Sequence, residues 1–331
     1  MRGEMNVSRR DFLRRLLSTG IATTGTVIGA LLLHDKRTGK EYFRQMFEKH
    51  AHRIPSFSVD VGASGVQMVV VRGSDVRRMI KAAFDTLGGA RKFIQKNDVV
   101  LIKPNVAFDR PPALCATTNP ETLKAVIEIC YEAGAKEVIV ADNPINEPEG
   151  CFIKTGIKRA ALESGARIIY PKSHSFEMVE IGGVALKSWL AFYEPLKLAT
   201  KVIGVAPVKD HNLSSASMCM KNWYGLLGGS RNRFHQRIHD VIADLANWIK
   251  PTLVILDGVR VLMSNGPTGG RLSDVATRNT IIAGVDQVAV DAFGYTLLGR
   301  NPNELGYLQR AKERGIGNPN WKGLNWKEVS V

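Results

Sequence analysis

Side chains that can do chemistry gather in one stretch of the chain, residues 209–235, with the sequence KDHNLSSASMCMKNWYGLLGGSRNRFH. The stretch holds two histidines, two lysines, two arginines and a Gly-Gly pair, which is more polar chemistry than an ordinary core helix carries. Histidine and lysine both serve as proton donors and acceptors in enzymes. His211 and Lys221 are therefore candidate catalytic residues.

The spacing within this stretch predicts a helix. Ser214 or Ser215 can cap its first turn, and glycines follow where it should end. Spacings of three and four residues place Lys221 and Asn222 together with the later glycine on one helical face. Since His211 leaves the preceding strand, we expect His211 and Lys221 to face the same cavity, with Asn222 binding substrate there.

Two glycine-rich loops are candidate anion sites, because backbone N–H groups in such turns can surround a phosphate or a carboxylate. In GLLGGSRNR, residues 225–233, Arg231 follows the glycine turn. The second loop is NGPTGG, residues 265–270, and contains Gly266 and Gly269. It lacks the Lys-Ser/Thr pair of a Walker motif. Arg231, Gly266 and Gly269 are predicted to bind an anionic substrate.

From residue 64 onward, short β-branched runs alternate with amphipathic helical patterns. The predicted strands cover residues 65–73, 97–105, 136–142, 167–171, 201–210, 252–258 and 279–285, and further predicted helices cover 75–89, 119–135, 155–166, 234–249, 286–299 and 302–315. Such alternation is typical of right-handed βαβ units. We predict an α/β fold with a mainly parallel sheet, helices on both faces, and a ligand cleft at the carboxyl ends of the strands.

Polar residues follow five of the predicted strands. They are Lys103 and Asn105, Asp142, His211, Asp257 and Asp286. Because the carboxyl ends of parallel strands meet at one edge of a sheet, we expect these side chains to share a site. Lys103 is a candidate catalytic residue and Asn105 a candidate substrate-binding residue. We expect Lys103 to lie outside the core, so Lys103→Met is expected to change stability by less than about 1 kcal/mol.

Carboxylates and histidines at these strand ends could also hold a divalent metal ion. The candidate ligands are Asp142, His211, His235, Asp257 and Asp286. His235 and His239 stand four residues apart and could chelate an ion from one helical face. Such ligands suit a hard or borderline ion that activates water or polarises a carbonyl. Lys103 and Lys221 are the alternative general bases, and the sequence does not identify the metal or cofactor.

The four cysteines, Cys115, Cys130, Cys151 and Cys219, contain no C-x-x-C pair. A ferredoxin-type iron–sulfur motif is therefore absent from this sequence. Cys130 lies on the apolar face of a predicted helix and is interpreted as a small buried residue. Sequence spacing leaves open whether Cys115 and Cys151 form a disulfide. The sequence does not indicate the oligomeric state.

The net charge of +14, from 45 Lys and Arg against 31 Asp and Glu, indicates a basic surface that favours anionic ligands. No basic run is interleaved with aromatic residues on a strand or helix face. The composition therefore argues against nucleic acid as a partner.

SRRDFLRR, residues 8–15, precedes an apolar, Gly- and Thr-rich run over residues 16–33. This segment resembles a twin-arginine export signal. The resemblance implies passage of the folded protein through the Tat translocase and a periplasmic location. Two alternatives stay open, cleavage of the signal or retention of residues 16–33 as an anchor in the cytoplasmic (inner) membrane. We predict a signal over residues 1–35, a charged tether over 36–60 and an α/β domain over 61–331.

Five segments together resemble the domain of unknown function 362 family and cover roughly residues 64–315. They are VLIKPNVAF, TTNPETLKAVIEICYEAGAKEVIVAD, the stretch 209–235, ILDGVRVLMSNGPTGG and IIAGVDQVAVDAFGYTLLG. The activity of this family is mostly unassigned. Some members carry an added ferredoxin-like module that this chain lacks.

Two classes of function remain. The first is an exported, metal-assisted enzyme acting on a small anionic substrate in the strand-end cleft. The second is a non-catalytic, cofactor- or iron–sulfur-related accessory or binding protein of a periplasmic redox system. Lysine, histidine and aspartate together at strand ends favour the enzyme.

Overall fold

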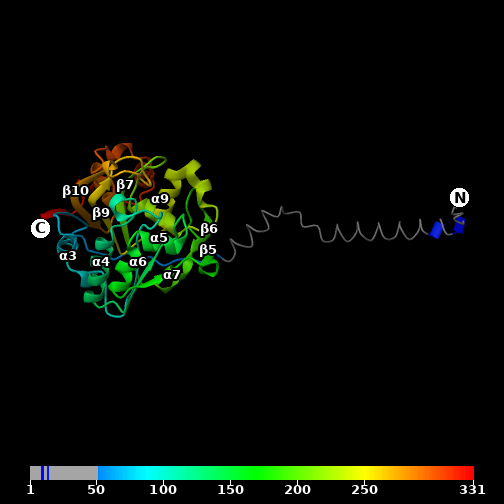
Figure 1. The fold of residues 1–331 in the computed structure, drawn as a ribbon, viewed down its shortest axis with the longest axis horizontal. Coiled ribbons are helices and arrows are strands. Elements are labelled where there is room, and N and C mark those ends of the chain that lie inside the picture. Colours follow the sequence, from blue (N-terminus) through cyan, green and yellow to red (C-terminus); the bar gives the residue numbers. More distant parts are fainter. Residues whose placement is uncertain (1–8, 11–12, 15–50) are drawn as a thin grey trace. The chain divides into compact units, whose positions relative to one another are not determined.

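The computed structural model of the chain describes residues 9–10, 13–14 and 51–331 (Figure 1). The predicted export signal and most of the predicted tether lie outside these residues, apart from the two short pieces in the signal. Residues 51–331 form one compact unit. Residues 51–60, which fall in the predicted tether, belong to this unit, and Phe57 is buried there with its N–H donating to the carbonyl of Lys250 at 3.0 Å.

Eleven strands are found in residues 51–331. They are β1 (Met68–Arg72), β2 (Val99–Lys103), β3 (Glu137–Ala141), β4 (Arg167–Ile169), β5 (Phe176–Glu180), β6 (Ser188–Phe192), β7 (Lys201–His211), β8 (Ser215–Ser217), β9 (Leu253–Leu262), β10 (Val275–Gly284) and β11 (Trp326–Ser330). The helices of the same part are α3 (Val76–Thr86), α4 (Pro120–Ala133), α5 (Pro148–Lys154), α6 (Ile157–Glu163), α7 (Tyr193–Leu198), α8 (Cys219–Asn222), α9 (Ile238–Trp248), α10 (Gln287–Thr296) and α11 (Gly306–Glu313).

The main sheet has the strand order β11-β1-β10-β9-β7-β2-β3-β4, and β8 pairs with β7. Strands β9, β7, β2, β3 and β4 are all parallel to their neighbours in this half of the sheet. In the other half, β10 runs antiparallel to both β9 and β1. The prediction of an α/β fold with a mainly parallel sheet is confirmed. The direction of β10 is the feature that the sequence pattern did not predict.

Helices cover both faces of the sheet (Figure 1). One hydrophobic core joins α3, α4 and α6 to alternate strand residues such as Val100 and Ile102. The other joins α9, α10 and α11 to the intervening residues, for example Leu101 and Ala141. Since both faces are buried, the central strands are continuous apolar runs, as expected for parallel strands under two layers of helix. This burial holds the ends of β2, β3 and β7 at defined positions.

The stretch 209–235 does not form one helix capped by Ser214 or Ser215. Strand β7 continues to His211 and returns through β8, with Ser215 in a left-handed conformation at φ 64°. Helix α8 has a single turn, and its Cys219 and Met220 N–H groups donate to the buried carboxylate of Asp291. Short 3-10 turns follow at Trp223–Leu226 and Arg231–Arg237. The glycines separate the polar residues onto several short elements.

All four cysteines are free thiols and buried, so Cys115 and Cys151 do not form a disulfide in this structure. In the described residues, no helix is both long and apolar enough to cross a membrane.

Candidate functional site

A cavity of about 870 Å³ opens at the carboxyl ends of β2, β3 and β7. These three strands are adjacent and parallel, in the order β7, β2, β3. The cavity is lined by eight of the predicted site residues, which are Lys103, Asn105, Asp142, His211, Lys221, Asn222, Arg231 and His235. Four of these eight residues, Lys103, Asn105, Asp142 and His211, come from the carboxyl ends of parallel strands, where the sequence predicted a shared site.

A buried ion pair forms the floor of the cavity. The Lys103 ammonium lies 2.7 Å from Asp142 Oδ1, and both side chains are 1% exposed. Lys103 also donates to Asn222 Oδ1 at 2.9 Å and to the Pro104 carbonyl at 2.8 Å. Burial lowers the pKa of Lys103, and the Asp142 carboxylate opposes that shift. The expectation that Lys103 lies outside the core is wrong, because its hydrogen bonds allow the strand end to be fully enclosed.

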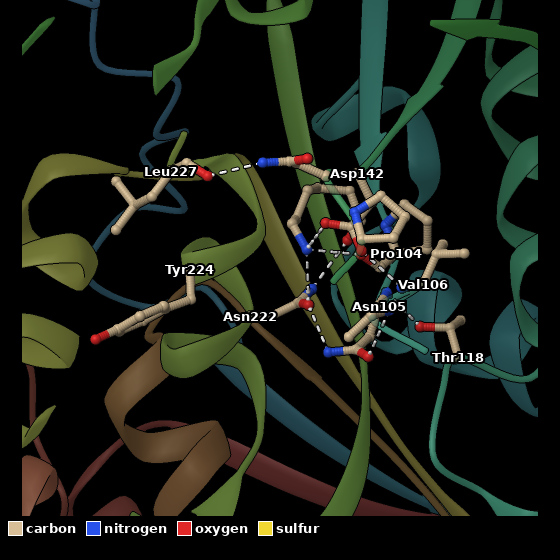
Figure 2. Close-up of polar contacts among 12 residues, drawn as sticks. Pro104, Asn105, Val106, Thr118, Asp142, Asn222, Tyr224 and Leu227 are labelled. Atoms are coloured by element: carbon tan, nitrogen blue, oxygen red, sulfur yellow. Dashed lines mark hydrogen bonds and ion pairs between the residues drawn. The ribbon is translucent and has the colours of Figure 1, made fainter. Parts of the chain in front are cut away.

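Asn222 connects this ion pair to β2. Its Nδ2 donates to the Lys103 carbonyl at 3.0 Å, and its Oδ1 accepts from Asn105 Nδ2 at 3.2 Å. On the other side, Asp142 Oδ2 accepts from the Val106 N–H at 2.6 Å. Figure 2 shows Asn105, Asn222 and Asp142 converging on this network. Each buried polar group is thereby held in one orientation by its partners.

Gly225 lies directly against the ion pair. A Cβ at this position would stand 2.0 Å from Asp142 Oδ1 and 2.5 Å from Lys103 Nζ. The site therefore requires a residue without a side chain here, which the sequence pattern alone did not predict.

Replacing Gly225 by alanine is expected to push the two charged groups apart. We expect a loss of about 1–3 kcal/mol in the free energy of unfolding, as for other overpacked sites, together with weaker binding of anions in the cavity. Urea unfolding measures the first and calorimetry the second. Gly270→Ala is the matched control, since nothing lies within 4 Å of the added carbon. Equal stability of both variants would contradict the close approach.

Lys209 is a second buried lysine of the cavity, and it was not among the predicted site residues. Its Nζ donates to the Ala116 carbonyl and, at 3.4 Å, to Asn105 Oδ1. It also lies 5.1 Å from the centre of the Phe108 ring. Burial and the Lys221 charge lower the pKa of Lys209 well below its usual value. The signal was present, because Lys209 is the second-last residue of the predicted strand 201–210.

Lys221 differs from the other two lysines, because no hydrogen bond or ion pair holds its ammonium within residues 51–331. Its Nζ lies 5.1 Å from the centre of the Tyr224 ring. Burial, together with the charges of Arg231 and Lys103, lowers the pKa of Lys221 to about 7. A lysine with this pKa exchanges a proton near neutral pH.

His211 is held as a neutral imidazole. Its Nδ1 accepts hydrogen bonds from the N–H groups of Leu213 at 3.1 Å and Ser214 at 3.4 Å. Burial and the charges of Lys221 and Lys209 lower the pKa of His211 to about 2. With Nδ1 accepting, the proton of the neutral ring lies on Nε2. His211 can therefore donate a hydrogen bond but does not act as a cation.

Arg231 closes one side of the cavity. Its guanidinium donates to four main-chain carbonyls, those of Tyr224, Leu227, Asn143 and Pro144. It joins the turn after α8 to the loop after β3, and it carries a positive charge without a carboxylate partner in the described chain.

The cavity has a strong excess of positive charge. Four cationic residues line it, Lys103, Lys209, Lys221 and Arg231. Asp142 is the one carboxylate among the described lining residues, and it is already paired with Lys103. Three formal positive charges remain uncompensated when Lys209 and Lys221 are both protonated, which favours an anionic ligand.

The family model described as Domain of unknown function (DUF362) matches residues 100–296. This match spans more than half of the chain and includes the strands and turns that build the cavity. The chain belongs to the DUF362 family. Its similarity to the Thylakoid-associated protein sll1697 of Synechocystis sp. is 24% identity over 251 residues, or 72% of this chain and 74% of the relative.

A solved structure similar to this DUF362 protein is the lactate racemase apoprotein from Thermoanaerobacterium thermosaccharolyticum. The sequences are 14% identical, the TM-score is 0.39, and the match covers 71% of this chain. It covers 59% of the racemase chain, so the DUF362 protein spans less than two thirds of that structure.

Two of the five predicted metal ligands of the DUF362 protein, Asp257 and Asp286, lie away from the cavity. Asp257 lies within β9 and not at its end, and accepts hydrogen bonds from Thr122 Oγ1 and the Val259 N–H. It lines a separate small pocket. Asp286 follows β10, whose antiparallel direction places it at the opposite edge of the sheet, where it caps α10.

The remaining metal candidates are already engaged. Asp142 is paired with Lys103, and His211 Nδ1 accepts from the backbone. His235 stacks near Tyr224, whereas His239 stacks near Tyr307, because the chain changes from a 3-10 turn to α9 between them. No group of three or more potential ligands occurs in residues 9–10, 13–14 and 51–331. These donors do not fit a metal centre.

The predicted glycine loop 265–270 contributes a proline to the cavity lining and not the two glycines that were expected to bind the substrate. Pro267 lines the cavity, whereas Gly266 and Gly269 do not. The N–H of Gly266 donates to the Asp210 carboxylate and that of Gly269 to the Asn265 carbonyl, so neither is open to a ligand. Gly228 and Gly229, from the turn after α8, line the cavity in their place.

Proposed function

We propose that this DUF362 protein is an enzyme that binds an organic anion in the cavity at the ends of β2, β3 and β7. The observation that carries the proposal is the charge of the lining, four cationic residues against one paired carboxylate. Two of the lysines are fixed in hydrogen-bonded networks, which prepares a positive surface before the ligand arrives. Lys221 is the group that exchanges a proton with the substrate.

The apolar lining indicates that the anion has a hydrophobic part. Phe108, Phe176 and Leu190 line the cavity. Ile145 and Leu213 also line it and are 65% and 50% exposed. A cavity of about 870 Å³ is within the size range of cofactor-sized ligands. An aryl or alkyl carboxylate or phosphate fits this combination better than a simple inorganic ion does.

The chemical roles follow from the contacts. Lys221 transfers a proton, His211 Nε2–H donates to an oxygen of the substrate, and the buried Lys103–Asp142 pair with Asn222 fixes the floor of the site. No step is assigned to a metal ion, because the donors do not fit one. The alternative is a binding protein that holds the same anion without changing it, as the fixed orientations of Lys103 and Lys209 would permit.

The proposal is tested by calorimetry with phenyl phosphate, inorganic phosphate and phenol. We expect phenyl phosphate to bind most tightly and its affinity to fall as salt is raised. A mixture of organic carboxylates and phosphates is then incubated with the protein and with Lys221→Arg, and followed by mass spectrometry. Consumption of one anion by the unaltered protein alone supports an enzyme. Anion binding without consumption supports the binding protein, and no anion binding overturns both.

We also propose that the protein is exported by the Tat translocase to the periplasm, either cleaved or anchored in the cytoplasmic membrane through residues 16–33. The support is the sequence SRRDFLRR, residues 8–15, ahead of an apolar run. The relative from Synechocystis is described as thylakoid-associated, which accords with a protein that acts beside a membrane.

Export is expected to depend on Arg9 and Arg10. Replacing both by lysine keeps the charge but removes the paired guanidinium groups, so we expect the protein to remain in the cytoplasm. Cell fractionation followed by immunoblotting measures this. Replacing Arg14 and Arg15 by lysine is the control and is expected to leave most of the export intact. Undiminished export of the Arg9/Arg10 variant would show that another route is used.

A further inference from the structure

The three lysines of the cavity are in different states. Lys103 is held by Asp142, Asn222 and the Pro104 carbonyl, and Lys209 by the Ala116 carbonyl and Asn105. These contacts fix the position of both Nζ atoms, so neither side chain is free to move toward a carbonyl carbon of a bound ligand. Lys221 lines the same cavity with no such acceptor in residues 51–331.

Titratable side chains from several elements of the cavity lie near Lys221. Lys103, Lys209 and His211 come from the ends of β2 and β7, and Arg231 and His235 come from the turn at residues 231–237. Asp142 is the one acidic group of the described lining, and its partner is Lys103. Lysines whose pKa is lowered by a neighbouring cation are ones that enzymes use as nucleophiles.

We propose that Lys221 is an amine nucleophile that forms an imine with an aldehyde or ketone carbonyl of the bound organic anion. This inference rests on the proposed anion site and adds the functional group that the substrate must carry. The cationic neighbours hold the anionic group of the substrate, while Nζ reaches the carbonyl carbon. The Tyr224 ring, 5.1 Å from Nζ, covers one side of the amine.

The step is balanced without any further reagent. The lone pair of Nζ forms the new C–N bond, and the π bond of the carbonyl breaks toward oxygen. The oxygen takes a proton from the nitrogen and leaves as water after a second proton transfer, which gives the imine. His211 Nε2–H is the donor of the cavity that can bind the carbonyl oxygen during addition, because Nδ1 is occupied by the backbone.

If Lys221 were a general base, it would only have to accept a proton. If it only bound the anion, its positive charge would be enough. Imine formation also requires a primary amine, which arginine lacks. Lys221→Arg therefore separates anion binding from chemistry, because it keeps the positive charge and removes the amine. Covalent trapping of the imine on Lys221 then separates a nucleophile from a general base.

Pyridoxal phosphate is the probe, because it is an anionic aromatic aldehyde of suitable size. The full chain is treated with one equivalent of the probe, reduced with borohydride, digested and sequenced by mass spectrometry. We expect one main adduct, on Lys221, that is lost in Lys221→Arg and in the presence of excess inorganic phosphate. Lys197→Arg, at an exposed surface lysine, is the matched control and is expected to leave the adduct unchanged.

The pH dependence of labelling by the probe distinguishes Lys221 from lysines on the protein surface. Labelling of Lys221 is expected to reach half its maximum near pH 7, where the amine loses its proton, whereas surface lysines react near their usual pKa of about 10.4. Lys221→Arg should still bind inorganic phosphate within about threefold, because its charge is retained, and this measurement also verifies that the variant is folded.

Two results separate the inference from the proposed function. If phosphate or phenyl phosphate binds but the probe labels exposed lysines and leaves Lys221 unmodified, the imine proposal is overturned and the anion site stands. If neither anion binds to the unaltered protein, the proposed function itself is wrong. Selective, phosphate-sensitive labelling of Lys221 supports both.

Discussion

Asp142→Ala is expected to lower the free energy of unfolding by about 3–5 kcal/mol. The substitution leaves the Lys103 ammonium buried, 1% exposed, without its carboxylate partner. Removing one member of a buried ion pair costs this much because the remaining charge is no longer compensated. The N–H of Val106 also loses its acceptor. Chemical denaturation measured by circular dichroism gives the value.

The matched control is Asp109→Ala, which removes an exposed carboxylate 3.9 Å from Lys154. A surface pair of this kind contributes no more than about 1 kcal/mol. A double variant, Lys103→Met with Asp142→Leu, replaces the buried pair by apolar groups and should recover most of the stability. It should not recover anion binding. Equal stability of Asp142→Ala and Asp109→Ala would show that water reaches Lys103.

Lys221→Met is expected to weaken anion binding by roughly thirtyfold, or about 2 kcal/mol, the typical contribution of a hydrogen bond to a charged group. The same substitution is expected to raise the stability of the free protein. Lys221 is confined beside Arg231 and Lys103 with no acceptor in the described chain, so methionine removes repulsion while filling a similar volume. Calorimetry and thermal unfolding measure the two effects.

The stabilisation should depend on pH. The folded state holds the pKa of Lys221 at about 7, below its ordinary value of 10.5. Between these values the unfolded chain binds a proton that the folded chain does not, so the stability of the unaltered protein rises with pH. The repulsion is fully present below pH 7 and disappears by pH 10.5. Lys221→Met should therefore gain most below pH 7, and a gain that is constant with pH would contradict this origin.

Part of the site could be predicted from the expectation that polar residues at the carboxyl ends of parallel strands lie together. Lys103, Asn105, Asp142 and His211 follow adjacent parallel strands, and the structure places all of them in one cavity. This expectation was wrong for Asp286, because alternating patterns do not report strand direction and β10 is antiparallel. Alternating patterns also do not report strand length. The prediction for Asp257 was wrong because β9 continues past this residue to Leu262.

The stretch 209–235 shows a different limit. Its residue types correctly indicated a polar site, but the long helix was wrong because tertiary contacts override local spacing. The carboxylate of Asp291, far away in the sequence, accepts from Cys219 and Met220 and starts α8 after β8. The close approach of Gly225 to the ion pair is likewise a property of packing, which no single sequence pattern contains.

The cavity has one wall made of strand ends and another made of 3-10 turns, and this difference has a consequence for hydrogen exchange. The amides at the ends of β2 and β3 lie between two hydrophobic cores and should exchange only when the whole protein unfolds. Residues 231–237 contain no buried side chain and form only short 3-10 turns. Their amides should exchange through local opening and become protected when an anion binds.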